Sequence, residues 1–350
     1  MNRPTDRVRK LARLRAIIDA RGAEGLLLTS AESLAWLFDG ARVSVPLGGP
    51  AVLTAAVDAD GSIFVHAPAN EVDRLREEEL GGGVRIQELP WFEPLPVAAD
   101  GWLTEGDVVP ELRAARASLL PAELERYRAL GTEVAALTTD VLAATRPDRT
   151  ERAVAADLAA RLVAAGAEPV VLLVAGEART GVPHPLPTAA RLGARAMAVV
   201  GARRDGLIVN LTRWVGADPG DGTREAALRE VEADALAATE PGRVLSDVLG
   251  DIARSYERHG FGADAWLRHH QGGPTGYLGR DPKATPAAAD RIVAGQAFAW
   301  NPWAPGLKLE DTVVVHADGI EELTTDPRWP VVDARGRQRP RTLGYGEELP

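Results

Sequence analysis

The sequence predicts a mixed α/β chain of two domains. Its 350 residues exceed what a single hydrophobic core usually organises. Short helical and strand-like segments alternate up to Leu112, and a long helix opens near Pro121, where proline is tolerated in the first turn. We therefore place the boundary between the two, giving domains 1–118 and 119–350.

Local patterns predict the elements of the first domain. Apolar residues recur at helical spacing over 7–21, and Gly22 follows as a C-terminal stop. Ser30 is an N-cap candidate for a helix that runs to Phe38. The other predicted elements are strands at 25–29, 51–57 and 62–66 and a charged helix at 70–80.

The second domain is predicted to contain four helices and several strands. Thr150 is a candidate cap for the second helix. The helices are expected at 119–145, 150–165, 223–238 and 245–259, and the strands at 169–174, 196–200, 206–214, 292–300 and 311–315. The segment from Ala334 onward is rich in Arg, Gly and Pro, so we expect it to pack loosely.

Composition excludes several classes of function. The apolar fraction of 45% and charged fraction of 26% are those of a soluble globular protein. The net charge is -10 and arginines are interleaved with acids, so no basic stripe for nucleic acid is expected. Cysteine is absent, which excludes thiolate chemistry and favours a cytoplasmic location. No export signal or membrane-spanning run of about 18 apolar residues is recognisable.

Three polar clusters are candidates for chemistry. His184 stands between prolines that fix the local backbone, although an isolated loop histidine is equally typical of solvent exposure. His269 and His270 precede a glycine-rich run, which is compatible with a ligand site or with a structural turn. Asn301 lies between two tryptophans, and Glu310 begins an apolar strand, where an acid is more often solvated than catalytic.

In their order along the chain, these clusters resemble the creatinase, prolidase and aminopeptidase P superfamily. Gly201-Ala-Arg-Arg-Asp-Gly-Leu-Ile-Val-Asn210-Leu-Thr-Arg213 is similar to the strand pair that ends in an Asp-Ile-Thr-Arg motif. His269-His-Gln-Gly-Gly-Pro-Thr-Gly276 resembles the His-x-x-Gly-His-x-x-Gly segment, and Gly306-Leu-Lys-Leu-Glu-Asp311 resembles the closing Gly-Val-Arg-Ile-Glu-Asp strand. The resemblance implies a creatinase-like α/β domain followed by a pita-bread domain, an antiparallel curved sheet covered by helices. It also implies a homodimer.

The metal ligands of that superfamily are mostly replaced here. The resemblance places its two aspartates at Val199 and Asn210, its histidine at Gly273, and its first glutamate at Asn301, unless a shift of register lets His270 serve. Only the last glutamate, Glu310, is kept. Two divalent ions need several anionic oxygens to offset their dehydration. We therefore expect no metal pair and no cofactor.

Creatinase-type members, which hydrolyse a C–N bond without metal, offer a precedent for the remaining residues. The resemblance makes His184 the proton-transferring group, with His269 facing the substrate and Glu310 binding a cationic group or assisting proton transfer. The residues expected to line the substrate site are Asn210, Arg213, His270, Tyr277, Trp300, Asn301 and Trp303.

Three functions remain open at this stage. The first is a metal-independent, creatinase-like hydrolase of a small guanidino, amidine or amide substrate. The second is an inactive binding or scaffold protein that keeps the fold. The third is an Xaa-Pro peptidase with an atypical metal site. The expected partners are a small molecule or a short peptide and a second copy of the chain, without nucleic acid or membrane.

Overall fold

The computed structural model describes residues 6–81, 83–217 and 222–349. The chain forms two compact units, Met1–Leu124 with Asp205–Leu207 and Glu125–Arg204 with Ile208–Pro350. The boundary between residues 118 and 119 remains a sequence prediction, and the units found here part at residues 124 and 125.

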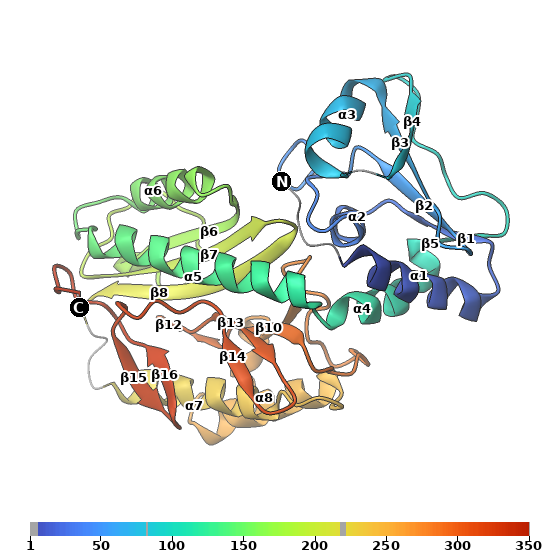
Figure 1. The fold of residues 1–350 in the computed structure, drawn as a ribbon. Helices are drawn as coiled ribbons and strands as arrows, with labels where there is room; N and C mark the ends of the chain where they lie inside the picture. Colours follow the sequence, from blue (N-terminus) through green and yellow to red (C-terminus); the bar gives the residue numbers. More distant parts are fainter. Residues whose placement is uncertain (1–5, 82, 218–221, 350) are drawn as a thin grey trace. The chain divides into compact units, whose positions relative to one another are not determined.

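The first unit is built on a mixed five-stranded sheet in the order β4-β3-β2-β1-β5 (Figure 1). Strand β1 (Gly25–Leu28) pairs antiparallel with β2 and parallel with β5, and all four of its residues are buried, as expected for an inner strand. The other strands are β2 (Thr54–Asp58), β3 (Ile63–Pro68), β4 (Arg85–Leu89) and β5 (Trp102–Thr104).

Local capping explains where the helices of the first unit begin and end. Helix α1 (Arg7–Arg21) ends at Gly22, whose φ of 62° is left-handed. Helix α2 (Ala31–Leu37) begins after Ser30, which accepts a hydrogen bond from the backbone N–H of Ser33. The other helical segments are α3 (Ala69–Arg74), a π-helical turn (Leu75–Glu79), a 3₁₀ turn (Glu105–Val108) and α4 (Val109–Ala117).

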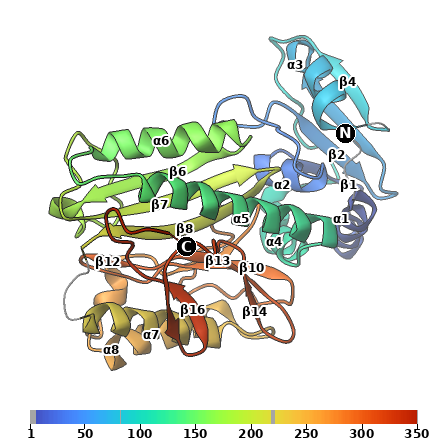
Figure 2. The same ribbon diagram turned by 60° about the vertical axis from the view of Figure 1, so that its left-hand side comes forward.

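Two sheets and two helical layers make the second unit. The three-stranded sheet β6-β7-β8 is covered by α5 and α6, and the four-stranded sheet β14-β13-β10-β9 is covered by α7 and α8 (Figures 1 and 2). The helices are α5 (Pro121–Ala143), α6 (Glu151–Ala164), α7 (Thr223–Ala238) and α8 (Leu245–Arg258). The strands of the two sheets are β6 (Glu168–Gly176), β7 (Arg195–Arg204), β8 (Leu207–Gly216), β9 (Gly272–Thr275), β10 (Gln296–Trp300), β13 (Asp311–Val315) and β14 (Ile320–Glu322). This is the predicted pita-bread architecture.

The hydroxyl of Thr312 joins the two sheets of the second unit. It accepts a hydrogen bond from the backbone N–H of Asn210 at 2.7 Å and donates to the backbone carbonyl of the same residue at 3.0 Å. The backbone N–H of Thr212 donates to the carbonyl of Glu310 at 2.9 Å. The middle of β8 is therefore held beside the start of β13.

The main core of this unit lies between its second sheet and the two helices below it. Leu228 and Val231 of α7 and Val248 and Ile252 of α8 pack in one cluster with Phe298. Two short strand pairs complete the fold, β11 (Trp303–Ala304) with β12 (Leu307–Lys308) and β15 (Val331–Ala334) with β16 (Arg337–Pro340). Short 3₁₀ turns occur at Glu177–Arg179 and Ala265–Arg268.

The expectation of a loosely packed C-terminal tail is wrong. Strand β16 pairs in register with β15, and the Arg339 guanidinium on it is buried against Glu232 and Asp311 at 2.6 and 2.8 Å. Composition suggested a polar tail, but the tail supplies a cation that the interior acids need. Among the described helices, none is long and apolar enough to cross a membrane.

Candidate functional site

Backbone register brings the candidate residues to one end of the second sheet. Trp300 of β10 lies opposite Asp311 of β13 and Gly272 of β9. The next residue, Asn301, donates its backbone N–H to the Gln271 carbonyl at 3.0 Å, and the same ladder leads to Glu310. Three segments far apart in sequence therefore end together.

Three imidazoles gather beside these strand ends. His184, from the loop between Glu177–Arg179 and β7, has its Nε2 3.1 Å from Nε2 of His269. The His270 ring stacks on both, with centroids 4.5 Å from His269 and 5.5 Å from His184. Trp303 stacks on the other partner, 6.1 Å from the His269 centroid. His269 is buried whereas His184 is exposed. The structure therefore places His184, His269, His270 and Trp303 in one group.

Burial and nearby cations keep these imidazoles neutral. Burial lowers the pKa of His269 to about 2, and the charge of Lys308 acts in the same direction. Burial and the charge of Arg280 lower the pKa of His270 to about 3. Burial and Lys308 also lower the pKa of His184, against an opposing effect of Glu310. Near neutral pH, one ring of the His184–His269 pair donates an N–H and the other accepts it.

Glu310 has two cationic neighbours in the folded chain. Its Oε1 accepts a hydrogen bond from Arg280 at 2.6 Å, and its Oε2 lies 3.8 Å from the Lys308 ammonium. The Thr212 hydroxyl donates to Oε2 at 3.1 Å. The expectation that this carboxylate receives a cationic ligand therefore meets a physical obstacle, because protein cations already neutralise it.

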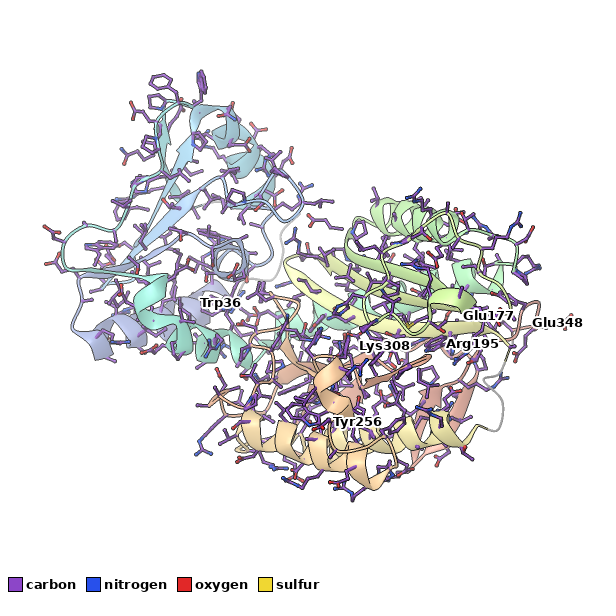
Figure 3. The ribbon with its side chains drawn as sticks, turned by 180° about the vertical axis from the view of Figure 1, so that it is seen from behind. Trp36, Glu177, Arg195, Tyr256, Lys308 and Glu348 are labelled. Carbon is purple, nitrogen blue, oxygen red and sulfur yellow. The ribbon has the colours of Figure 1, made fainter. Side chains whose placement is uncertain are left out.

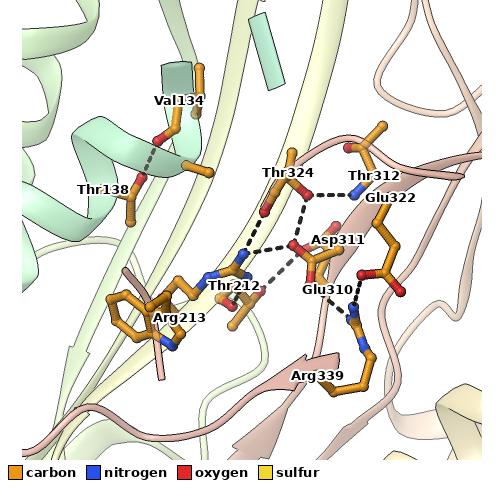
Figure 4. Close-up of polar contacts among 12 residues, drawn as sticks. Val134, Thr138, Thr212, Arg213, Glu310, Asp311, Thr312, Glu322, Thr324 and Arg339 are labelled. Carbon is orange, nitrogen blue, oxygen red and sulfur yellow. Dashed lines mark hydrogen bonds and ion pairs between the residues drawn. The ribbon is translucent and has the colours of Figure 1, made fainter. Parts of the chain in front are cut away.

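Arg213 has a structural partner rather than a free guanidinium. It donates to Asp311 at 2.8 Å and to the Thr324 carbonyl at 2.6 Å, and its ring neighbour is Trp329 (Figure 4). Asp311 also accepts from Arg339 at 2.8 Å. The neighbouring acids Glu310 and Asp311 thus point to different networks, as alternation along a strand requires. The proposal of Arg213 as a substrate contact has no support in this geometry.

Trp300 also lies away from the imidazoles. It belongs to the main core with Phe298, 5.8 Å away in a stacked arrangement, and its indole N–H donates to Thr239. The expectation that Trp300 lines the site is therefore wrong, because residues two apart on β10 share the core face. Tyr277, which follows β9, is buried.

The two amides at the site are buried and poorly satisfied. The Asn210 amide donates to the Thr275 hydroxyl at 3.4 Å. The Asn301 side-chain oxygen is buried without a hydrogen-bond partner. A neutral amide offers an ion one oxygen at most, in place of a carboxylate.

The residues present do not fit the two-metal centre implied by the superfamily. Val199 belongs to an apolar cluster with Met197 and Trp214. Gly273 has a φ of 137°, and a β-carbon there would lie 2.8 Å from the Pro282 carbonyl, so no histidine side chain has room. Glu310, the one acid kept, faces protein cations. No bridging carboxylate remains for a pair of ions.

The three imidazoles are a weaker candidate for a single ion. One ligand atom from each lies within 4.8 Å of the others. The His269 and His270 rings are nearly parallel, at 22°, and stacked. Their in-plane lone pairs therefore run side by side, whereas bonds of about 2.0–2.1 Å to one ion require them to converge. Two charged residues of the same sign, Lys308 and Arg280, also act on these rings.

Sequence reasoning missed Lys308 and Arg280. Lys308 is two residues before Glu310, and strand alternation places such residues on one face, so this signal was available. Arg280 carries no local signal, since its contact with Glu310 spans 30 positions. Figure 3 shows Lys308 in the interior of the second unit.

Comparison with known proteins agrees with this fold. The family model described as "Metallopeptidase family M24" matches residues 125–317, more than half of the chain. A dipeptidase PepE from Mycobacterium ulcerans is similar in structure, with 21% identity, a TM-score of 0.73, and coverage of 92% of this chain and 96% of that one. A prolidase from Pyrococcus horikoshii OT3 gives 16%, 0.73, 91% and 98%.

The fold is also shared with a protein of a different description. The N-terminal domain of the FACT complex subunit SPT16 from chickpea is 12% identical, with a TM-score of 0.65 and coverage of 91% of this chain and 97% of that one. No curated protein sequence matches the chain significantly. At these identities the structural similarities establish the fold alone.

Proposed function

The chain belongs to metallopeptidase family M24, and from that membership we propose a hydrolase that cleaves a C–N bond of a small substrate without a metal ion. The observation that carries the proposal is the His184–His269 pair, 3.1 Å apart, beside the Glu310 carboxylate. A neutral imidazole with an exposed edge is a base available near neutral pH.

His184 is the proton-transferring residue in this proposal. It takes a proton from a water molecule, whose oxygen attacks the carbon of the C–N bond, and returns the proton to the leaving nitrogen. The products are an acid and an amine. His269 orients the His184 ring through their hydrogen bond, and Glu310 stabilises the imidazolium that forms, since its charge raises the pKa of His184.

Among the expected substrates, the charge of the site favours an amide over a guanidino or amidine compound. A guanidinium or amidinium needs an uncommitted carboxylate. Glu310 is engaged by Arg280 and lies beside Lys308. An amide is neutral and avoids repulsion from these two cations.

The test is turnover of a panel of small amides, guanidino compounds and dipeptides by the tag-free chain. We expect hydrolysis of at least one amide, unaffected by a chelator, and a loss of about 100-fold or more in kcat/KM for His184→Ala. His316→Ala is the matched control, because His316 pairs with Glu321 at 2.7 Å. Activity that disappears with the chelator and returns with Mn²⁺, Co²⁺ or Zn²⁺ would instead support the atypical Xaa-Pro peptidase.

The pH profile gives an independent check. The lowered pKa of His184 keeps its base form populated below 6.5, its usual value. The kcat/KM is therefore expected to stay level as the pH falls to 6.5, and to decline only below it. An acid limb centred above 6.5 contradicts the assignment.

A second candidate is a binding protein that keeps the fold without turnover. Its support is the loss of four of the superfamily's ligand positions together with the similarity to a FACT complex subunit. Ligand binding without hydrolysis of any compound in the panel favours it. A homodimer and a cytoplasmic location remain parts of the proposal, and light scattering of the purified chain measures the first.

A further inference from the structure

The Lys308 side chain is buried with less compensation than an ammonium requires. The residue is 2% exposed, and its only printed ion pair is with Glu310 Oε2, at 3.8 Å. Within residues 6–81, 83–217 and 222–349, no acceptor lies at hydrogen-bond distance from its Nζ. An ammonium carries three donors, and leaving them unpaired in the interior is costly.

Other buried cations of the same chain are fully compensated. Lys10, in the first unit, contacts Asp39 at 2.7 Å, Glu123 at 3.0 Å and the Trp36 carbonyl at 2.6 Å. Arg339, in the second unit, contacts three carboxylates. Where a buried cation serves the fold, this chain surrounds it with acceptors. Lys308 departs from that pattern, and it does so at the candidate functional site.

The local charge balance identifies the missing partner. Arg280 and Lys308 are two cations against the single carboxylate of Glu310. The neighbouring imidazoles add no charge near neutral pH, because burial lowers their pKa values. The Arg280 Nε is a further buried donor without a hydrogen-bond partner. One positive charge and several donors are therefore left over, which matches a singly charged oxyanion better than a dianionic phosphate.

We propose that Lys308 and Arg280 form a binding site for a carboxylate group of the ligand, at the place where the superfamily holds metal ions. The inference deepens the proposed function, on which it rests for its substrate, by adding a carboxylate to the small amide. In this site Lys308 supplies a compact charge and Arg280 its free Nε donor, while Glu310 keeps the Arg280 guanidinium in place.

Acetate is the probe, with acetamide as its neutral isostere, both added at constant ionic strength against sodium chloride. We expect acetate to raise the Tm of the wild-type chain in a saturable way and acetamide to leave it unchanged. Lys308→Met should abolish the response to acetate, and Lys308→Arg should retain at least part of it. Lys283→Met is the matched control, because Lys283 is exposed.

Each outcome decides the proposal. It is overturned if acetate has no effect beyond that of chloride, or if Lys308→Met responds like the wild type. A response to inorganic phosphate without one to acetate overturns the choice of a monoanion. Circular dichroism of each variant verifies folding, and carbon-13 acetate line broadening measures binding without melting the protein.

Binding and turnover fail separately. Acetate binding with no hydrolysis in the substrate panel removes the proposed hydrolase and leaves the carboxylate site. Hydrolysis that depends on His184, with no acetate response, removes the carboxylate site and leaves the hydrolase.

Discussion

Replacing Lys308 with methionine should stabilise the chain in the absence of ligand. At 3.8 Å from Glu310, and with an effective dielectric constant of about 20, the attraction is worth about 4 kcal/mol. Desolvation of a buried ammonium costs several kcal/mol, and Arg280 repels it further. Burial lowers the pKa of Lys308, which agrees in sign with a net penalty on its charged form. Because Glu310 keeps Arg280 as a partner, we expect the free energy of unfolding to rise by about 1 kcal/mol.

The assay is urea unfolding followed by tryptophan fluorescence and circular dichroism, comparing midpoint and slope without added anions. Lys10→Met provides the contrast, because it leaves Asp39 and Glu123 buried without their cation and should lose about 3–5 kcal/mol. The same substitution thus has opposite signs at two buried lysines. A loss of about 3 kcal/mol or more for Lys308→Met refutes the reasoning, since it would mean that the ammonium is already satisfied.

Three further substitutions test the rest of the structure. Asp311→Asn leaves two buried guanidinium groups short of an anion and should lower the free energy of unfolding by about 3–5 kcal/mol in urea titrations. Asp234→Asn should cost about 1–2 kcal/mol at pH 7, because hydrogen bonds from serine and arginine side chains outweigh burial and lower the Asp234 pKa. This stability is present above pH 3.8 and is lost as the pH falls through the lowered pKa, so the two proteins should converge in acid. Gly273→Ala should lower the Tm, because its β-carbon meets the Pro282 carbonyl, while Gly181→Ala, in open space, should not.

The fold was predictable where local chemistry decides it. The Ser30 and Thr150 side chains accept from Ser33 and Ala153, so both predicted helix starts are confirmed. The second helical layer and its sheet followed from periodicity alone. The tail did not, because β16 is held by the ion pairs of Arg339 with residues distant in sequence, which no local pattern records.

The site was predictable only in part. Order and spacing pointed to His184 and His269, and the structure brings them to 3.1 Å. Alternation could have assigned Trp300 to the core with Phe298, since the two are two residues apart on one strand. The role of Arg280 could not be inferred, because its contact with Glu310 depends on how a loop folds back on the sheet.

The metal content of the tag-free chain tests the central claim most directly. The chain is saturated in turn with Mn²⁺, Co²⁺ and Zn²⁺, desalted, and measured by inductively coupled plasma mass spectrometry. Because Arg280 and Lys308 face the one acid that is kept, we predict well below one ion per chain. Two ions per chain, lost in the Glu310→Gln variant, would contradict the account.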